Sequence, residues 1–162
     1  GWLKKALFGA LEGPVENPEG QKINTLVPGS VTAPLCGGNL SLLVASLGTP
    51  WEIDTKGKIL FLEDIGEKTY RVDGMLTQLR NAGKFRDCAG IILGAWTDCE
   101  PEYPEKTLLL PEIFQQLIVP AGKPLIMDFA CGHVLPTAAL PMGRTCTLNA
   151  DTLTITLGGE TK

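Results

Sequence analysis

The sequence has a single histidine, His133, in 162 residues, and it has no excess of positive charge. Its formal net charge is -4 and its isoelectric point is about 5.0. Phosphate backbones are bound by clustered basic surfaces, so this balance argues against nucleic acid as a partner. The sequence also lacks any apolar run near the roughly 18 residues that a membrane-spanning helix needs. We therefore expect neither nucleic acid nor a membrane among its partners.

Cysteine pairs with metal or redox spacing are also missing. The chain has an odd number of cysteines at irregular intervals: Cys36, Cys88, Cys99, Cys131 and Cys146. A structural zinc site takes four ligands, usually from closely spaced Cys and His pairs, and no Cys-x-x-Cys pair is present. The pattern favours free thiols in a cytosolic protein, with at least three of them buried as small apolar side chains. We expect a cytoplasmic location and no metal site.

The first twenty residues differ from the rest. Their apolar run is too short for a signal peptide. Helical spacing instead predicts a short amphipathic helix from Leu3, Leu7, Ala10 and Leu11. Residues 13–20 are rich in proline and glycine, which is typical of a loop. We therefore assign residues 1–20 to a linker helix and loop, and residues 21–162 to one domain.

Strand-like and helix-like segments alternate through the middle of the chain. Short apolar runs bounded by turn residues predict buried strands at 58–62, 89–94 and 124–127. Apolar residues three and four positions apart predict helices at 40–47, 72–79 and 108–119. This order is typical of a parallel sheet with crossover helices.

Other segments follow a different pattern. Residues 23–35 mix β-branched residues with prolines, which indicates an irregular or edge strand. The glycines at 37 and 38 indicate a turn into the next helix, with Asn39 as its N-cap. Alternation of apolar and polar residues at 145–148 and 152–157 predicts an antiparallel hairpin. The predicted fold class is α/β, with a mixed, mostly parallel sheet, flanking helices and a C-terminal antiparallel hairpin.

Side chains suited to acid and base chemistry follow two of the predicted strands. Glu63 comes directly after the strand at 58–62, with Asp64 beside it, and His133 follows the strand at 124–127. Catalytic groups are often displayed at the carboxyl ends of parallel strands. A carboxylate there could orient an imidazole that acts as a general base. Alternatively, the carboxylates, with Glu67, solvate a loop and His133 is structural; position alone leaves this open.

Five segments together resemble one known family. They are Leu35-Cys36-Gly37-Gly38-Asn39-Leu40, Gly57-Lys58-Ile59-Leu60-Phe61-Leu62-Glu63-Asp64, Tyr70-Arg71-Val72-Asp73-Gly74-Met75-Leu76, Gly94-Ala95-Trp96-Thr97-Asp98-Cys99 and Gly132-His133. In this order they resemble the C-terminal domain of LD-carboxypeptidases, the muramoyltetrapeptide carboxypeptidases of serine peptidase family S66. The likeness spans nearly the whole chain and implies a swivelling-domain-like fold.

The resemblance implies a Ser-His-Glu triad, in which Glu63 and His133 match the family's Glu and His. The family's serine lies on a sharp turn in an N-terminal domain, and no serine of this chain lies in a Gly-x-Ser-x-Gly-like turn. We therefore expect the nucleophile and the oxyanion hole to come from a missing N-terminal domain, with no metal or other cofactor. Glu63 and His133 should lie at one edge of the sheet, both facing an open surface with exposed apolar residues.

Three further residues are candidates for substrate binding. Arg71 could meet a substrate carboxylate, or it could be an ordinary surface charge. Trp96 and Asp98 follow a predicted strand and could line the site, although core packing explains Trp96 equally well. Cys131 lies two residues before His133, but the resemblance gives the nucleophile to a serine, and a zinc site needs more ligands than this pair supplies.

The resemblance also implies an activity. The parent enzyme would hydrolyse the bond between an L-centre, such as a diamino acid, and the terminal D-Ala of murein tetrapeptides in cell-wall recycling. The same family includes amidases that act on peptidyl-nucleotide antibiotics such as microcin C. The non-enzyme alternatives are a stand-alone binding domain and a metal-binding module around Cys131 and His133. The resemblance further allows a homodimer.

Overall fold

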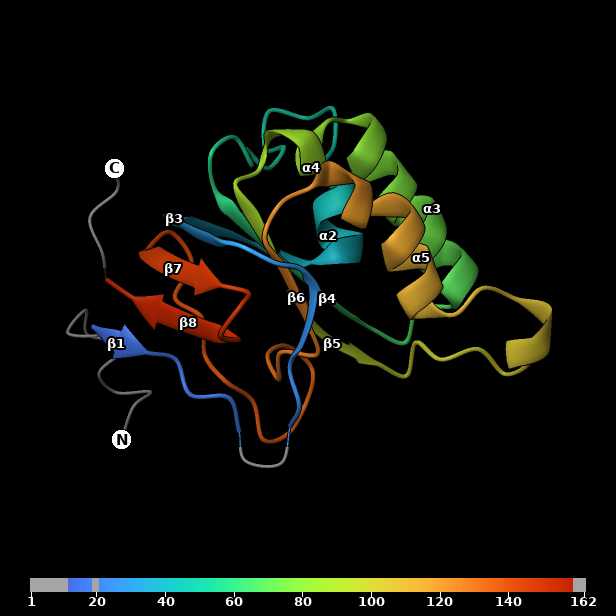
Figure 1. Cartoon of the computed structure of the whole chain (residues 1–162). Coiled ribbons are helices and arrows are strands. Elements are labelled where there is room, and N and C mark those ends of the chain that lie inside the picture. Colours follow the sequence, from blue (N-terminus) through green and yellow to red (C-terminus); the bar gives the residue numbers. More distant parts are fainter. Residues whose placement is uncertain (1–11, 19–20, 159–162) are drawn as a thin grey trace.

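The computed structural model describes residues 12–18 and 21–158. An eight-stranded mixed sheet forms its centre, in the order β1-β8-β7-β3-β4-β5-β6-β2 (Figure 1). The neighbours β3, β4, β5 and β6 are parallel, and the remaining pairs are antiparallel. The predicted α/β class, parallel core and C-terminal hairpin are confirmed. The antiparallel part is larger than predicted, because β1 and β2 add at the two edges of the sheet.

The predicted elements occur in the predicted order, and the described residues contain one strand and one α-helix that were not predicted. The strands are β1 (Gly13–Pro14), β2 (Asn24–Val27), β3 (Ser30–Asn39), β4 (Ile59–Ile65), β5 (Gly90–Thr97), β6 (Leu125–Met127), β7 (Thr145–Asn149) and β8 (Thr154–Leu157). The helices are α2 (Leu40–Ala45), α3 (Thr69–Asn81), α4 (Lys84–Asp87) and α5 (Leu110–Leu117), with 3₁₀ turns at Pro104–Lys106 and Val119–Ala121. None of the helices in the described part of the chain has the length and apolar character to cross a bilayer.

The central strands are buried on both faces, which explains their almost unbroken apolar sequences. In β4, Leu60 and Leu62 pack with residues of α3 and α5 in one core cluster. Ile59 and Phe61 point the other way and pack with residues of β7 and β8 in a second cluster. Figure 1 accordingly shows the helices gathered on one side, away from β1, β7 and β8. The sheet therefore separates two cores.

The prediction of an irregular or edge strand at 23–35 was wrong for its second half. β3 is a central strand that pairs with β7 as far as Pro34 and with β4 from Leu35 onward. Pro34 lies where one partner gives way to the other, so the missing N–H is tolerated. Gly37 also belongs to this strand, not to a turn: its φ is 124°, and a Cβ there would lie 2.0 Å from the carbonyl oxygen of Phe61. Glycine is needed because β3 and β4 approach closely at this point.

The start of the chain differs from the prediction in one respect. The proline- and glycine-rich stretch was predicted to be a loop, but Gly13 and Pro14 pair with β8. Val15 is buried, and its N–H donates to the carbonyl of Ile155. This short strand is therefore part of the sheet. The helix predicted within residues 1–11 lies outside the described residues.

Candidate functional site

The carboxyl ends of β3, β4 and β5 meet at one edge of the sheet, and this edge carries the predicted acid–base residues. Glu63 lies near the end of β4, in register with Asn39 at the end of β3. His133 lies on the segment that follows β6 and crosses this edge. The crossing is fixed by two contacts to β5: Ala95 N–H donates to the carbonyl of Cys131, and the hydroxyl of Thr97 donates to the carbonyl of His133. The prediction that Glu63 and His133 share one edge is confirmed.

Glu63 and His133 are in direct contact. Oε2 of Glu63 accepts a hydrogen bond from Nδ1 of His133 at 2.8 Å and a second one from the His133 backbone N–H at 3.2 Å. Two bonds to one carboxylate oxygen fix both the backbone and the ring of His133. With its proton on Nδ1, the imidazole has Nε2 left as a free base.

The two side chains differ in their access to solvent. The Glu63 side chain is 6% exposed, whereas that of His133 is 52% exposed. The expectation that both face an open surface was therefore wrong for Glu63. The reason is Gly132, which passes so close to the carboxylate that a Cβ at this position would lie 2.5 Å from Glu63 Oε2. Only the imidazole reaches the surface.

The carboxylate changes the acid–base properties of the imidazole. The hydrogen bond from His133 to Glu63 raises the pKa of His133 above its ordinary value of 6.5, and the negative charge of Glu63 adds to this effect. The imidazolium is thereby stabilised, which suits a base that must hold a proton briefly.

His133 lines a shallow hollow of about 530 Å³, called here the His133 hollow. Its walls include Thr97, Val134 and Leu135. Leu135 is a large apolar side chain that is 89% exposed. One exposed apolar side chain therefore lies beside His133, and the apolar residues of the predicted N-terminal helix lie outside the described residues.

Asp64 organises the neighbouring strand and helix ends. It is 1% exposed and accepts hydrogen bonds from the Asn39 side chain at 2.9 Å, from Ser41 N–H at 3.0 Å and from Ile65 N–H at 2.8 Å. Asn39 in turn accepts from Leu42 N–H and caps α2, as predicted. The alternative that Glu63 and Asp64 solvate a loop is wrong, since both are buried. The sequence showed both carboxylates but not this network.

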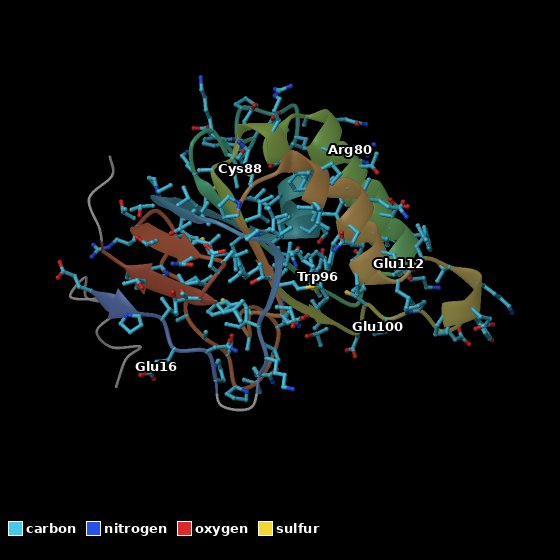
Figure 2. The ribbon with its side chains drawn as sticks, viewed as in Figure 1. Glu16, Arg80, Cys88, Trp96, Glu100 and Glu112 are labelled. Carbon is cyan, nitrogen blue, oxygen red and sulfur yellow. The ribbon has the colours of Figure 1, made fainter. Side chains whose placement is uncertain are left out.

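None of the three predicted substrate-binding residues lines the His133 hollow. Arg71 on α3 pairs with Glu67 at 2.6 Å. Trp96 packs on Phe114 of α5, with ring centroids 5.1 Å apart, and its buried Nε1 has no hydrogen-bond partner among the described residues (Figure 2). Asp98 is exposed at the end of β5 and lines a different hollow.

Sequence reasoning missed the two glycines that bring the His133 segment onto the sheet. A Cβ at Gly94 would lie 2.5 Å from the carbonyl oxygen of Cys131, and Gly132 comes equally close to Glu63. The available signal was the presence of both glycines in the family-like segments, where glycine indicates a close backbone approach.

The cysteines behave as expected of buried apolar residues. All five are free, and four of them are buried. Burial raises the pKa of the Cys131 thiol to about 11, so this residue stays protonated near neutral pH. The described residues contain no group of three or more His, Cys, Asp and Glu side chains placed to hold a metal ion.

A buried carboxylate that holds a surface imidazole at a strand edge is the arrangement of the acid–base pair in triad hydrolases. Comparison with models of protein families identifies the family to which the chain belongs. The family model described as "LD-carboxypeptidase C-terminal domain" matches residues 32–148. This match covers well over half of the chain, so the chain belongs to the LD-carboxypeptidase C-terminal domain family, as the resemblance implied.

Individual relatives agree with this assignment. The chain is 46% identical over 127 residues to the probable murein peptide carboxypeptidase of Bacillus subtilis, covering 78% of the chain and 40% of the relative. It is 35% identical over 126 residues to the murein tetrapeptide carboxypeptidase of Pseudomonas aeruginosa, covering 76% of the chain and 40% of that protein. The crystal structure of muramoyltetrapeptide carboxypeptidase from Oxalobacter formigenes is similar with a TM-score of 0.72 and 29% identity, covering 88% of the chain and 51% of the structure. The chain thus spans about half or less of these relatives.

Proposed function

We propose that this chain is the acid–base half of a murein LD-carboxypeptidase, with His133 as the general base and Glu63 as the residue that orients it. The observation that carries the proposal is the 2.8 Å contact between Glu63 Oε2 and His133 Nδ1 beside an imidazole that is half exposed. The proposed substrate is a murein tetrapeptide, because relatives at 46% and 35% identity have murein peptides in their names.

The proposed mechanism uses a serine from the other half of the enzyme. Nε2 of His133 takes the proton of the serine hydroxyl as its oxygen attacks the carbonyl on the acyl side of D-Ala. The imidazolium then gives this proton to the amine of the leaving D-Ala, and a water molecule repeats the sequence on the acyl-enzyme. Glu63 keeps the ring in the tautomer with Nδ1 protonated and stabilises its charged form. Because the imidazole is at the surface and the carboxylate is buried, a second domain can reach the base without disturbing the pair.

The free thiols are consistent with the proposed place of action. All five cysteines are free, which suits a reducing compartment such as the cytoplasm, where murein fragments would be recycled.

The test is release of D-Ala from an L,D-tetrapeptide by the full-length enzyme. His133→Ala should lower turnover by roughly 10⁴-fold or more, the scale known for triad members. Glu63→Gln should also lower it strongly, but less, because the shape of the pair is kept while the charge is lost. The chain by itself should release no D-Ala, since the base accelerates little without a nucleophile and oxyanion donors. Turnover by the chain alone, or near-normal turnover by the His133 variant, would refute the proposal.

A further inference from the structure

The parallel strands β4 and β5 do not keep one register along their whole length. Leu62 of β4 pairs with Leu93 of β5. Asp64 is two positions further along β4, but its partner Trp96 is three positions further along β5. One extra residue of β5 therefore lies opposite Glu63, which is the arrangement of a β-bulge. Bulges are frequent beside active sites, where they change the direction of a side chain.

The extra residue decides which side chains at the end of β5 face the helices. Successive side chains of a regular strand point to opposite faces of the sheet, so residues three positions apart would face opposite ways. In β5, however, Leu93 and Trp96 both pack in the core cluster that contains residues of α3 and α5. The next residue, Thr97, points to the other face, where its hydroxyl donates to the carbonyl of His133. The bulge therefore brings Thr97, and not Trp96, to the segment that carries His133.

The hydroxyl of Thr97 is a donor in a well-defined position. The backbone of Thr97 is tied to the end of β4, because its carbonyl accepts a hydrogen bond from Gly66 N–H at 2.9 Å. Threonine is branched at Cβ, so its χ1 angle is restricted and its hydroxyl has few alternative directions. The same residue lines the His133 hollow. Thr97 therefore joins β5 firmly to the backbone of His133.

His133 is held from two neighbouring strands at once. Glu63 of β4 accepts hydrogen bonds from its backbone N–H and from Nδ1, and Thr97 of β5 donates to its carbonyl. The peptide groups on both sides of its Cα are thus fixed, and with them the direction of the imidazole. Without the hydroxyl of Thr97, the closest printed bond to β5 is the one from Ala95 N–H to Cys131, two residues earlier. The ring would then be free to move away from the carboxylate.

We propose that Thr97 is a positioning residue for the general base, which keeps Nε2 of His133 at the place where the serine hydroxyl is deprotonated. The role in the reaction rests on the proposed function. Thr97 acts only through His133 and takes no part in proton transfer itself. A reacting group misplaced by about 1 Å can lower the rate by about 10²-fold. The loss of one hydrogen bond to the backbone of the base therefore affects turnover more than it affects stability.

The first experiment measures D-Ala release by variants of the full-length enzyme. Thr97→Val removes the hydroxyl and keeps the shape of the side chain. It should lower kcat by about ten- to a hundredfold and leave KM unchanged, because the position of the base affects the chemical step and not substrate binding. Thr97→Ser restores the hydroxyl and should recover most of kcat. Thr55→Val is the matched control: the Thr55 hydroxyl, shortly before β4, also donates to a backbone carbonyl, that of Lys84 at 3.0 Å, and its loss should leave kcat unchanged.

The second experiment follows the His133 imidazole and does not depend on activity. In Thr97→Val the pKa of His133 should fall toward its ordinary value of 6.5, because the hydrogen bond to Glu63 is the largest cause of its raised pKa. Thr97→Ser and Thr55→Val should keep the wild-type pKa in the same NMR titration. A merely structural role of Thr97 would lower the free energy of unfolding and leave this pKa unchanged. If Thr97→Val does not fold, Thr97→Ala removes the same hydroxyl and takes its place.

The outcomes distinguish this inference from the proposed function. If the wild-type enzyme releases no D-Ala, the proposed function fails, and the titration of His133 still decides whether Thr97 positions the imidazole. If the enzyme is active and Thr97→Val has the kcat and the His133 pKa of the wild type, the proposed function stands and the role of Thr97 is overturned. An equal loss of kcat in Thr97→Val and Thr97→Ser would also overturn it, because the hydroxyl would then not be the group that matters.

Discussion

Replacing Gly132 by alanine should separate Glu63 from His133 without changing either residue. The new Cβ would lie 2.5 Å from Glu63 Oε2 and 2.8 Å from its Cγ, so the carboxylate would have to move. Its two hydrogen bonds to His133 depend on Oε2 and would be lost. The raised pKa of His133 has the hydrogen bond to Glu63 as its largest cause. In Gly132→Ala this pKa should fall back toward its ordinary value of about 6.5.

The cost in stability can be worked out from the same geometry. Gly132 has φ of 113°, and a residue with a side chain is strained there by about 1–3 kcal/mol. The clash with Glu63 adds about 1–3 kcal/mol, the usual cost of overpacking. Gly143→Ala is the matched control: its φ is 82°, and a Cβ there meets nothing within 4 Å. This control should have the backbone strain alone and leave the His133 pKa unchanged.

The assay is direct because His133 is the only histidine in the sequence. A proton NMR titration of the imidazole gives its pKa without any assignment problem, and urea unfolding gives the free energy of unfolding of the wild type and both variants. If Gly132→Ala unfolds at the same urea concentration as Gly143→Ala and keeps the wild-type His133 pKa, then Gly132 does not position the pair and the reasoning is wrong.

Three further predictions concern single residues. The pKa of His133 lies above its unfolded value of about 6.5, so the stability that the Glu63 pair contributes is complete below that pH and is lost as pH rises through the folded pKa. In Glu63→Gln the free energy of unfolding should lose this pH dependence. An unchanged pH profile would contradict the pairing. Asp64→Asn should lower the free energy of unfolding by about 1–3 kcal/mol, because an amide oxygen cannot accept all three hydrogen bonds. Asp54 is exposed, so the control Asp54→Asn should change the free energy of unfolding by less than about 1 kcal/mol. Equal losses of stability in the two variants would refute the role of the Asp64 hydrogen bonds. Cys131, whose pKa is raised to about 11 by burial, should resist iodoacetamide at neutral pH in the folded chain, and rapid labelling would show a reactive thiol.

Much of the fold could be predicted from local patterns. β4 is apolar through its whole centre, because both of its faces are covered, and α3 has apolar residues at helical spacing because one face packs on the sheet. The cap of α2 by Asn39 was also predicted, since capping depends on neighbouring residues. β3 was predicted less well. Its proline and glycines indicate an edge or a turn, yet the strands on both sides of it come from distant parts of the sequence.

The sequence by itself determined most of the elements and their order, and that a carboxylate and an imidazole lie near or beyond the carboxyl ends of two strands. These features depend on residues a few positions apart. Only the tertiary structure decided that Glu63 is buried, that His133 is at the surface, and that the two are in contact across 70 positions of sequence. The physical reason is that this contact depends on the close approach of the segment at Gly132 to β4 and β5. No local pattern specifies the distance between two segments that the chain brings together only when it folds.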